Sequence, residues 1–208
     1  MTHVHNPIYH HFKGDEITRI ELMERMVVET ILKSKRPDED RLWSKTFELK
    51  HSSSVAQIGR ILAEKRGLDP GLSAIICAMH DIYVFVTGRT KEHAHRGAPI
   101  AERLIRKTKK FTDKETKLIT SAIYQHSDKH IVSKNPYIEL VKDADVFDCS
   151  LYNGVHDAYV YEKLPAICRI YFDRIKKVRR ELGLPKDKKW DTIDYIEQGK
   201  VYDAKHGQ

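Results

Sequence analysis

Apolar residues recur at the spacing of an α-helix along almost the whole chain. No segment shows a sustained alternation of period two flanked by the turn residues of a β-hairpin. The pattern therefore predicts an all-α fold. The expected helices cover residues 16–33 (capped by Asp15), 51–66, 70–81 (with 86 as an alternative end), 92–108, 112–127, 136–152 and 164–182.

The size of the chain favours one domain. It has 208 residues, of which 40% are hydrophobic and 32% are charged. This composition excludes a disordered or collagen-like chain and supplies enough apolar side chains for one core. We expect a single helical domain over residues 1–185, with its core at about 45–155, and a polar C-terminal tail over residues 186–208.

The apolar runs and the N-terminal residues indicate where in the cell the protein is expected. The longest runs, 74–79 and 82–86, are interrupted by His80 and Asp81, so we expect no membrane span. The N-terminal residues lack the basic start and apolar stretch of a signal peptide, and the three cysteines form no metal-type pair. We therefore expect a cytoplasmic protein.

The chain is basic, with a formal net charge of +7. This charge favours an anionic partner, which we expect to be a small molecule. The densest basic stretch, residues 174–189, could follow a nucleic-acid backbone, but Ile175 and Val178 place an apolar stripe beneath it. A solvated outer helix face explains the stretch better, so we do not expect nucleic acid as a partner.

Two histidines lie on apolar helix faces. His51 is followed by Val55 at i+4 and Leu62 at i+11, and His126 follows Ala122 by four residues. An imidazole that faces the core needs a partner. These two residues therefore qualify as candidate ligands on separate helices.

A dipeptide of histidine and aspartate ends the most apolar segment of the chain. An ionised Asp81 beside His80 would cost several kcal/mol there unless a cation compensates it. A metal ion is the natural compensator. A second such dipeptide, His156-Asp157, follows a polar turn, and we interpret it as a loop pair.

Helical phase selects two further candidates. His93 shares its face with Ile100 and points inward, whereas His95 points outward. Asp145 lies on the apolar stripe of Ile138, where a carboxylate again calls for a cation.

The candidate ligands are all imidazoles or carboxylates, and no cysteine belongs to the set. Such donors suit iron, manganese, nickel, cobalt or magnesium, and facing helices of a bundle core can hold them. The predicted metal ligands are His51, His80, Asp81, His93, His126 and Asp145.

This ordered pattern resembles the HD-domain superfamily of metal-dependent phosphohydrolases over residues 45–155. The resemblance implies a helical bundle with the metal site in its core and two divalent metal ions, iron being the first choice. It further implies that Asp81 bridges the ions and is the catalytic residue. By the same resemblance His51, His80 and Asp145 would complete one site, and His93 and His126 would complete the other. The Gly-Tyr-Pro of the cyclic-dinucleotide branch is not found after the later histidines.

The activity that this resemblance implies is hydrolysis of a phosphoester of a nucleotide or another small phosphorylated molecule by a metal-bridging hydroxide. Arg89, Arg96 and Lys129 are candidate substrate-binding cations, and Asp143 and Asp148 are candidate acceptors that orient ligand histidines. Solvated cations and helix caps are the alternatives for these residues. Two other functions stay open: a di-iron oxygenase on the same scaffold, and a non-catalytic module that binds a nucleotide.

Overall fold

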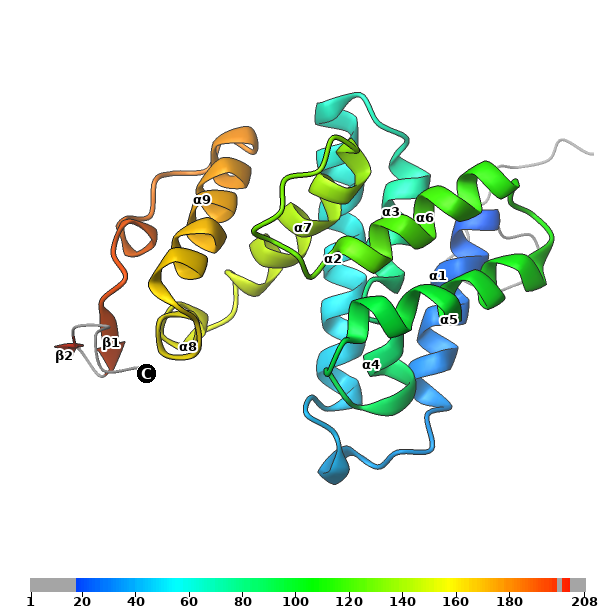
Figure 1. Cartoon of the computed structure of the whole chain (residues 1–208), viewed down its shortest axis with the longest axis horizontal. Helices are drawn as coiled ribbons and strands as arrows, with labels where there is room; N and C mark the ends of the chain where they lie inside the picture. Colours follow the sequence, from blue (N-terminus) through cyan, green and yellow to red (C-terminus); the bar gives the residue numbers. More distant parts are fainter. Residues whose placement is uncertain (1–17, 198–199, 203–208) are drawn as a thin grey trace, which may run out of the picture.

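Helices dominate residues 18–197 and 200–202, the part of the chain that this computed structural model describes (Figure 1). The all-α fold class predicted from the sequence is confirmed. The α-helices are α1 (Arg19–Leu32), α2 (Lys45–Arg66), α3 (Pro70–Met79), α4 (Ile82–Thr87), α5 (His93–Thr108), α6 (Asp113–Gln125), α7 (Pro136–Cys149), α8 (Val155–Glu162) and α9 (Pro165–Glu181). The short elements are two 3-10 turns, η1 (Asp38–Asp40) and η2 (Lys188–Asp191), and an antiparallel pair of strands, β1 (Tyr195–Glu197) and β2 (Lys200–Tyr202).

Local capping chemistry sets several helix ends. Helix α1 begins after Thr18, whose side chain forms a reciprocal capping box with Glu21. The sequence-based choice of Asp15 as this cap was wrong for the helix start, and Asp15 itself lies outside the described residues. Helix α2 ends, as predicted, at Gly67, which adopts the left-handed conformation (φ 65°) that glycine takes without strain.

Helix α2 is the centre of the packing. It contacts α3, α7 and α1, while α5 packs along α6 and against α4. Fully buried side chains such as Val55, Leu62 and Ile76 join these helices into one core. The core thus brings the ends of several helices to the same interior region.

The most apolar stretch, Pro70–Thr87, is long and apolar enough to cross a membrane, but 72% of it is buried inside the protein. The sequence left two ends open for the helix that begins at Pro70, one at Asp81 and one at Val86, and the structure ends it at the earlier point. The chain leaves helical geometry at Asp81 (φ −101°, ψ 23°), so that α3 ends and α4 begins on either side of His80 and Asp81. The break places both side chains at an interior helix junction.

A second, smaller core lies beyond α7. Trp190 is 1% exposed and packs with Phe172 and Cys168, among others. In Figure 1, α8, α9 and the strand pair lie on one side of α7, and α1 to α6 lie on the other. The polar tail expected after residue 185 is corrected here, because η2 contributes a core residue. His156 also departs from its predicted loop, since it is buried on α8 and stacks on Phe172.

Candidate metal centre

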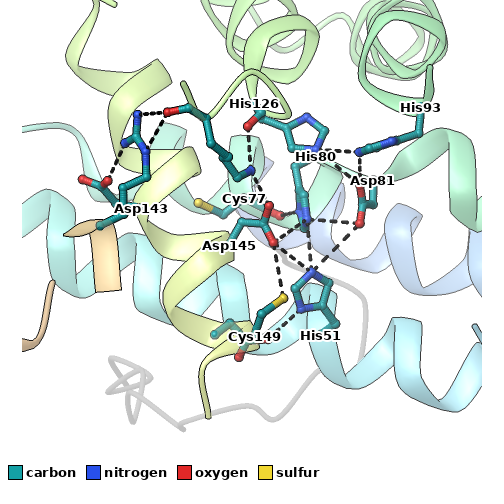
Figure 2. A network of polar contacts seen from close by, with 12 residues as sticks. His51, Cys77, His80, Asp81, His93, His126, Asp143, Asp145 and Cys149 are labelled. Carbon is teal, nitrogen blue, oxygen red and sulfur yellow. Dashed lines mark hydrogen bonds and ion pairs between the residues drawn. The ribbon is translucent and has the colours of Figure 1, made fainter. Parts of the chain in front are cut away.

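The six predicted ligands meet at one place in the core (Figure 2). They come from five different parts of the chain: the first half of α2, the junction of α3 and α4, the start of α5, the end of α6, and α7. Most are buried, with His80 at 0%, His126 at 1% and Asp81 at 5% exposure. The roles of these residues as ligands remain predictions, but the structure places their donor atoms side by side.

The outer ring nitrogens of the histidines are fixed by hydrogen bonds. Nδ1 of His80 donates to the Cys77 carbonyl at 2.7 Å, and Nδ1 of His126 donates to the Ile123 carbonyl at 2.7 Å. Nδ1 of His93 likewise donates to a backbone carbonyl, at 2.9 Å. A carbonyl oxygen only accepts, so each of these Nδ1 atoms carries a proton, and Nε2 is the nitrogen that faces the interior.

We call His51, His80, Asp145 Oδ1 and Asp81 Oδ2 the first histidine group. The two imidazole Nε2 atoms are 3.2 Å apart. Asp145 Oδ1 lies 3.5 Å from Nε2 of His51 and 3.8 Å from Nε2 of His80. Asp81 Oδ2 lies 3.3 Å from Nε2 of His80 and 4.0 Å from Nε2 of His51. The donor atoms of His51, His80 and Asp81 lie within 4.8 Å of one another, and Asp145 Oδ1 approaches both imidazoles.

We call His93, His126 and Asp81 Oδ1 the second histidine group. Asp81 Oδ1 lies 3.2 Å from Nε2 of His93 and 3.3 Å from Nε2 of His126, and the two nitrogens are 3.1 Å apart. Among the described residues nothing donates a hydrogen bond to this buried oxygen. Such an atom costs free energy unless something pairs with it, and a cation between the oxygen and the nitrogens would do so. The residues present therefore fit a metal ion.

The charges of the site follow from its neighbours. Burial lowers the pKa of His126 to about 4, so its ring is neutral near pH 7. Burial also opposes charge on His51, but the carboxylates of Asp145 and Asp148 outweigh it and raise its pKa to about 10. Burial acts against the charged form of Asp81 as well, yet the neighbouring histidines hold its pKa well below the usual range. In the absence of a cation, His51 therefore carries the proton that a metal ion would displace.

Lys129 closes one side of the first histidine group. Its Nζ donates to Asp145 Oδ2 at 2.5 Å and to the His126 carbonyl at 2.6 Å. The side chain is 4% exposed. Burial opposes its charge, but Asp145 outweighs burial and raises the pKa of the ammonium. A buried cation thus borders the cluster, and substrate binding by Lys129 remains a prediction.

The two candidate hydrogen-bond acceptors, Asp148 and Asp143, lie on different sides of α7 and have different partners. Asp148 accepts a hydrogen bond from Nδ1 of His51 at 2.6 Å, which is the orienting role expected for it. Asp143 does not contact a ligand histidine, so that expectation was wrong. It is paired with Arg66, Arg174 and Lys177, because α2 and α9 bring these cations to the other face of α7.

The two candidate arginines lie outside the cluster. Arg96 is exposed and pairs with Glu92 at 2.7 Å, and it donates to the Tyr83 hydroxyl at 3.2 Å. Arg89 is also exposed. His95 points outward, as predicted, and stacks on Tyr124.

Sequence reasoning missed three residues around the site. Ser54 donates a hydrogen bond to Asp148, and Arg174 donates to the Lys129 carbonyl at 2.9 Å. Cys149 Sγ lies 3.7 Å from Asp145 Oδ1. Ser54 and Cys149 could have been found from their positions three and four residues after ligands on the same helix. No local signal identifies Arg174, since it reaches the site from α9.

Comparison with known proteins agrees with this geometry. The model of the HD domain family matches residues 49–149, a segment that begins before His51 and ends at Cys149. No curated protein and no solved structure matches the chain. HD domains bind divalent metal ions and are in general metal-dependent phosphohydrolases. This match identifies residues 49–149 as an HD domain.

Proposed function

We propose that the protein hydrolyses a phosphoester of a nucleotide or another small phosphorylated molecule with the help of two divalent cations. The observation that carries this proposal is the placement of Asp81. Its two oxygens face two different histidine groups, and Oδ1 is buried without a hydrogen-bond donor in the described part of the chain. One bridging carboxylate between two sets of imidazoles is the arrangement that a dinuclear centre needs.

Each histidine group would hold one cation. His51, His80 and Asp145 would hold the first, His93 and His126 would hold the second, and Asp81 would bind both. Bound divalent cations supply acidity to water and positive charge to phosphoryl oxygens. The donor set suits iron best among the metals named from the sequence, with manganese, nickel, cobalt and magnesium as the others.

The charge of the cluster supports an anionic substrate. Asp81, Asp145 and Asp148 bring three negative charges, and Lys129 brings one positive charge. Two divalent cations would therefore turn a net negative interior into a net positive one. A buried excess of positive charge favours a phosphate group, which carries the compensating charge.

The protein's own groups would orient the reaction. Lys129 uses two of its N–H donors on Asp145 and the His126 carbonyl, so one donor is left for a phosphoryl oxygen. The hydrogen bonds at Nδ1 of each histidine keep the rings from rotating. These contacts fix the donors before substrate arrives, which lowers the reorganisation needed during the reaction.

The alternative of a nucleic-acid-binding regulatory module receives less support. Several basic residues of α9 are occupied within the molecule: Arg174 and Lys177 pair with Asp143, and Arg179 donates to the Pro185 carbonyl. A face whose cations already have partners has less to offer a phosphate backbone.

The first experiment measures metal content by elemental analysis of protein purified without chelator or histidine tag. About two ions per chain in the wild type, and their loss in Asp81→Ala, are expected. The same preparations are then tested against nucleotides and generic phosphate esters, with oxygen uptake recorded in parallel. Phosphate release without oxygen consumption supports the proposal, whereas oxygen-dependent turnover would favour the di-iron oxygenase.

A matched variant separates the metal centre from substrate binding. Lys129→Met removes the ammonium and keeps most of the apolar stem. We expect it to retain its metal ions and to lose at least about tenfold in kcat/KM for phosphoesters, the loss of one charged hydrogen bond. Absence of metal from the wild-type protein, even after reconstitution, would refute the proposed function.

A further inference from the structure

We propose that Cys149 donates its sulfur to the cation held by the first histidine group. The inference rests on the proposed metal centre and adds a ligand of a different chemical class to it. Cys149 is the last residue of α7 and follows Asp145 by one helical turn, so both side chains lie on the same helix face. Figure 2 shows the thiol beside His51 and Asp145, on the side of the cluster away from His93.

The distances match those of ligands that share one ion. Sγ lies 3.7 Å from Asp145 Oδ1, which in turn lies 3.5 Å from Nε2 of His51. These three donor atoms all lie within 4.8 Å of one another. Donors that bond one cation at about 2.0–2.3 Å are themselves about 3–4 Å apart. The thiol therefore needs only a small movement to complete a set of donors with His51 and Asp145.

A second observation shows that the cluster is built for a cation. Asp81 Oδ1 is buried and has no hydrogen-bond donor among the described residues, although it faces imidazole nitrogens. This oxygen faces the second histidine group, and the other oxygen of the same carboxylate, Oδ2, lies in the first histidine group, which Cys149 adjoins. Without a cation the thiol donates a hydrogen bond to Asp145 Oδ1.

The other two cysteines, which the structure also describes, have a different environment. Cys77 packs its sulfur against Gly59, where a Cβ would come within 2.5 Å of it. Cys168 belongs to the second core with Phe172 and Trp190. All three cysteines are free. Cys77 approaches a predicted ligand through its backbone carbonyl, whereas Cys149 approaches one through its sulfur. Cys168 serves as the internal control.

The ligation step is balanced without an oxidant. The S–H bond of Cys149 breaks, its proton goes to solvent, and the sulfur keeps the electron pair that it donates to the cation. A soft thiolate favours iron, cobalt or zinc over magnesium and manganese. The two histidine groups would then differ, since the second histidine group contains only nitrogen and oxygen donors.

Cobalt(II) is the probe that tests this assignment. Metal-free protein is titrated with cobalt(II), and the near-ultraviolet spectrum is recorded for the wild type, Cys149→Ser and Cys168→Ser. We expect a thiolate-to-cobalt charge-transfer band in the wild type and in Cys168→Ser, and its loss in Cys149→Ser. The dissociation constant for the tightest cobalt ion should rise in Cys149→Ser by about 10- to 100-fold, the range seen when a metal site loses a supporting group.

Alkylation provides a second readout that does not depend on a substitution. Iodoacetamide labelling followed by mass spectrometry compares the three cysteines with and without cobalt(II). Cobalt should protect Cys149 at least about tenfold, while the slow labelling of buried Cys168 should not change.

The outcomes separate this inference from the proposed function. Cobalt that binds at the expected stoichiometry without a charge-transfer band and without protection of Cys149 would overturn the sulfur ligand and leave the metal centre standing. Failure of the wild-type protein to bind cobalt at all would overturn both.

Discussion

Two carboxylates on helix α7, only two residues apart, meet opposite environments. Asp143 is 0% exposed and is surrounded by cations: Arg174 at 2.6 Å, Lys177 at 2.7 Å and Arg66 at 2.8 Å. Asp145 is 16% exposed; one of its oxygens accepts from Lys129, and the other faces the imidazole nitrogens of His51 and His80. Both carboxylates are negative, but only Asp143 is paired with guanidinium and ammonium groups on all sides.

The difference shows how a structural carboxylate can be told from a metal-binding one. Charge-paired and hydrogen-bonded on all sides, Asp143 has nothing left for a ligand, and breaking its pairs would leave uncompensated charges in the core. Asp145 Oδ1 and both oxygens of Asp81 face imidazole nitrogens, and a proton, as on His51, or a metal cation can bridge such a pair. The nature of the partner, not the burial, separates the two roles.

The largest expected effect comes from Asp145→Asn. This variant keeps the volume and removes the charge that faces the first histidine group. We expect metal-dependent phosphoester hydrolysis to fall by at least about 10³-fold, equivalent to roughly 4 kcal/mol of transition-state stabilisation. Steady-state kinetics on equal amounts of folded protein measure this loss. Asp143→Asn is the matched control, and it should retain wild-type kcat/KM; equal losses in the two variants would contradict the distinction.

The stability effects should run in the opposite order. Asp143→Asn removes the carboxylate that Arg66, Arg174 and Lys177 share, so the free energy of unfolding should fall by about 3–5 kcal/mol. Arg66 keeps Glu181 and Arg174 keeps Glu139 as partners. Urea denaturation of the metal-free proteins measures the loss. Asp145→Asn should lose less, about 1–3 kcal/mol, because one charge-assisted hydrogen bond is weakened. A loss below about 1 kcal/mol for Asp143→Asn would show that the cations find other partners.

Helical phase was enough to predict the fold class and the residues that meet in the cluster. A side chain's direction on a helix follows from its position in the sequence, and this rule separated inward His93 from outward His95. It could not separate the roles of Asp143 and Asp148. The side chains that contact Asp143 and Asp148 come from α2 and α9. How these helices pack against α7 cannot be read from the periodicity of α7 alone.

The C-terminal region shows the same limit. Trp190 lies in a stretch that reads as polar, and its burial depends on Phe172 and His156 from two other helices. The break at Asp81 was one of two helix ends that the sequence left open, because apolar periodicity continues through it. Long-range packing and functional geometry override local pattern at these positions.

A smaller effect is expected for the residue that orients His51. Asp148→Asn replaces the charged acceptor of the Nδ1 hydrogen bond with a neutral one. Metal affinity should fall by about 10- to 100-fold, with the ions still bound at high metal concentration. Isothermal titration with cobalt(II) measures the change. Ser54→Ala, which removes only a hydrogen bond to Asp148, should lose less; unchanged affinity in Asp148→Asn would assign it to folding alone, beside Asp143.

The smallest expected loss of stability is for Glu115, a carboxylate near the surface. It extends the comparison of interior carboxylates to an ion pair that is partly exposed. Glu115 accepts from Arg19 at 2.6 Å and from the Thr112 backbone at 2.9 Å, and the hydrogen bond from Arg19 is the main reason that its pKa falls from 4.5 to about 2. Glu115→Gln keeps the helix cap and removes the charge, so the free energy of unfolding at pH 7 should fall by only about 1 kcal/mol or less. Because folding lowers this pKa, the stabilisation is present above about pH 4.5 and disappears as the pH falls toward 2. Urea denaturation of the metal-free wild type and variant between pH 7 and pH 2 should show two curves that converge on acidification, and a constant difference would assign the effect to packing instead of charge.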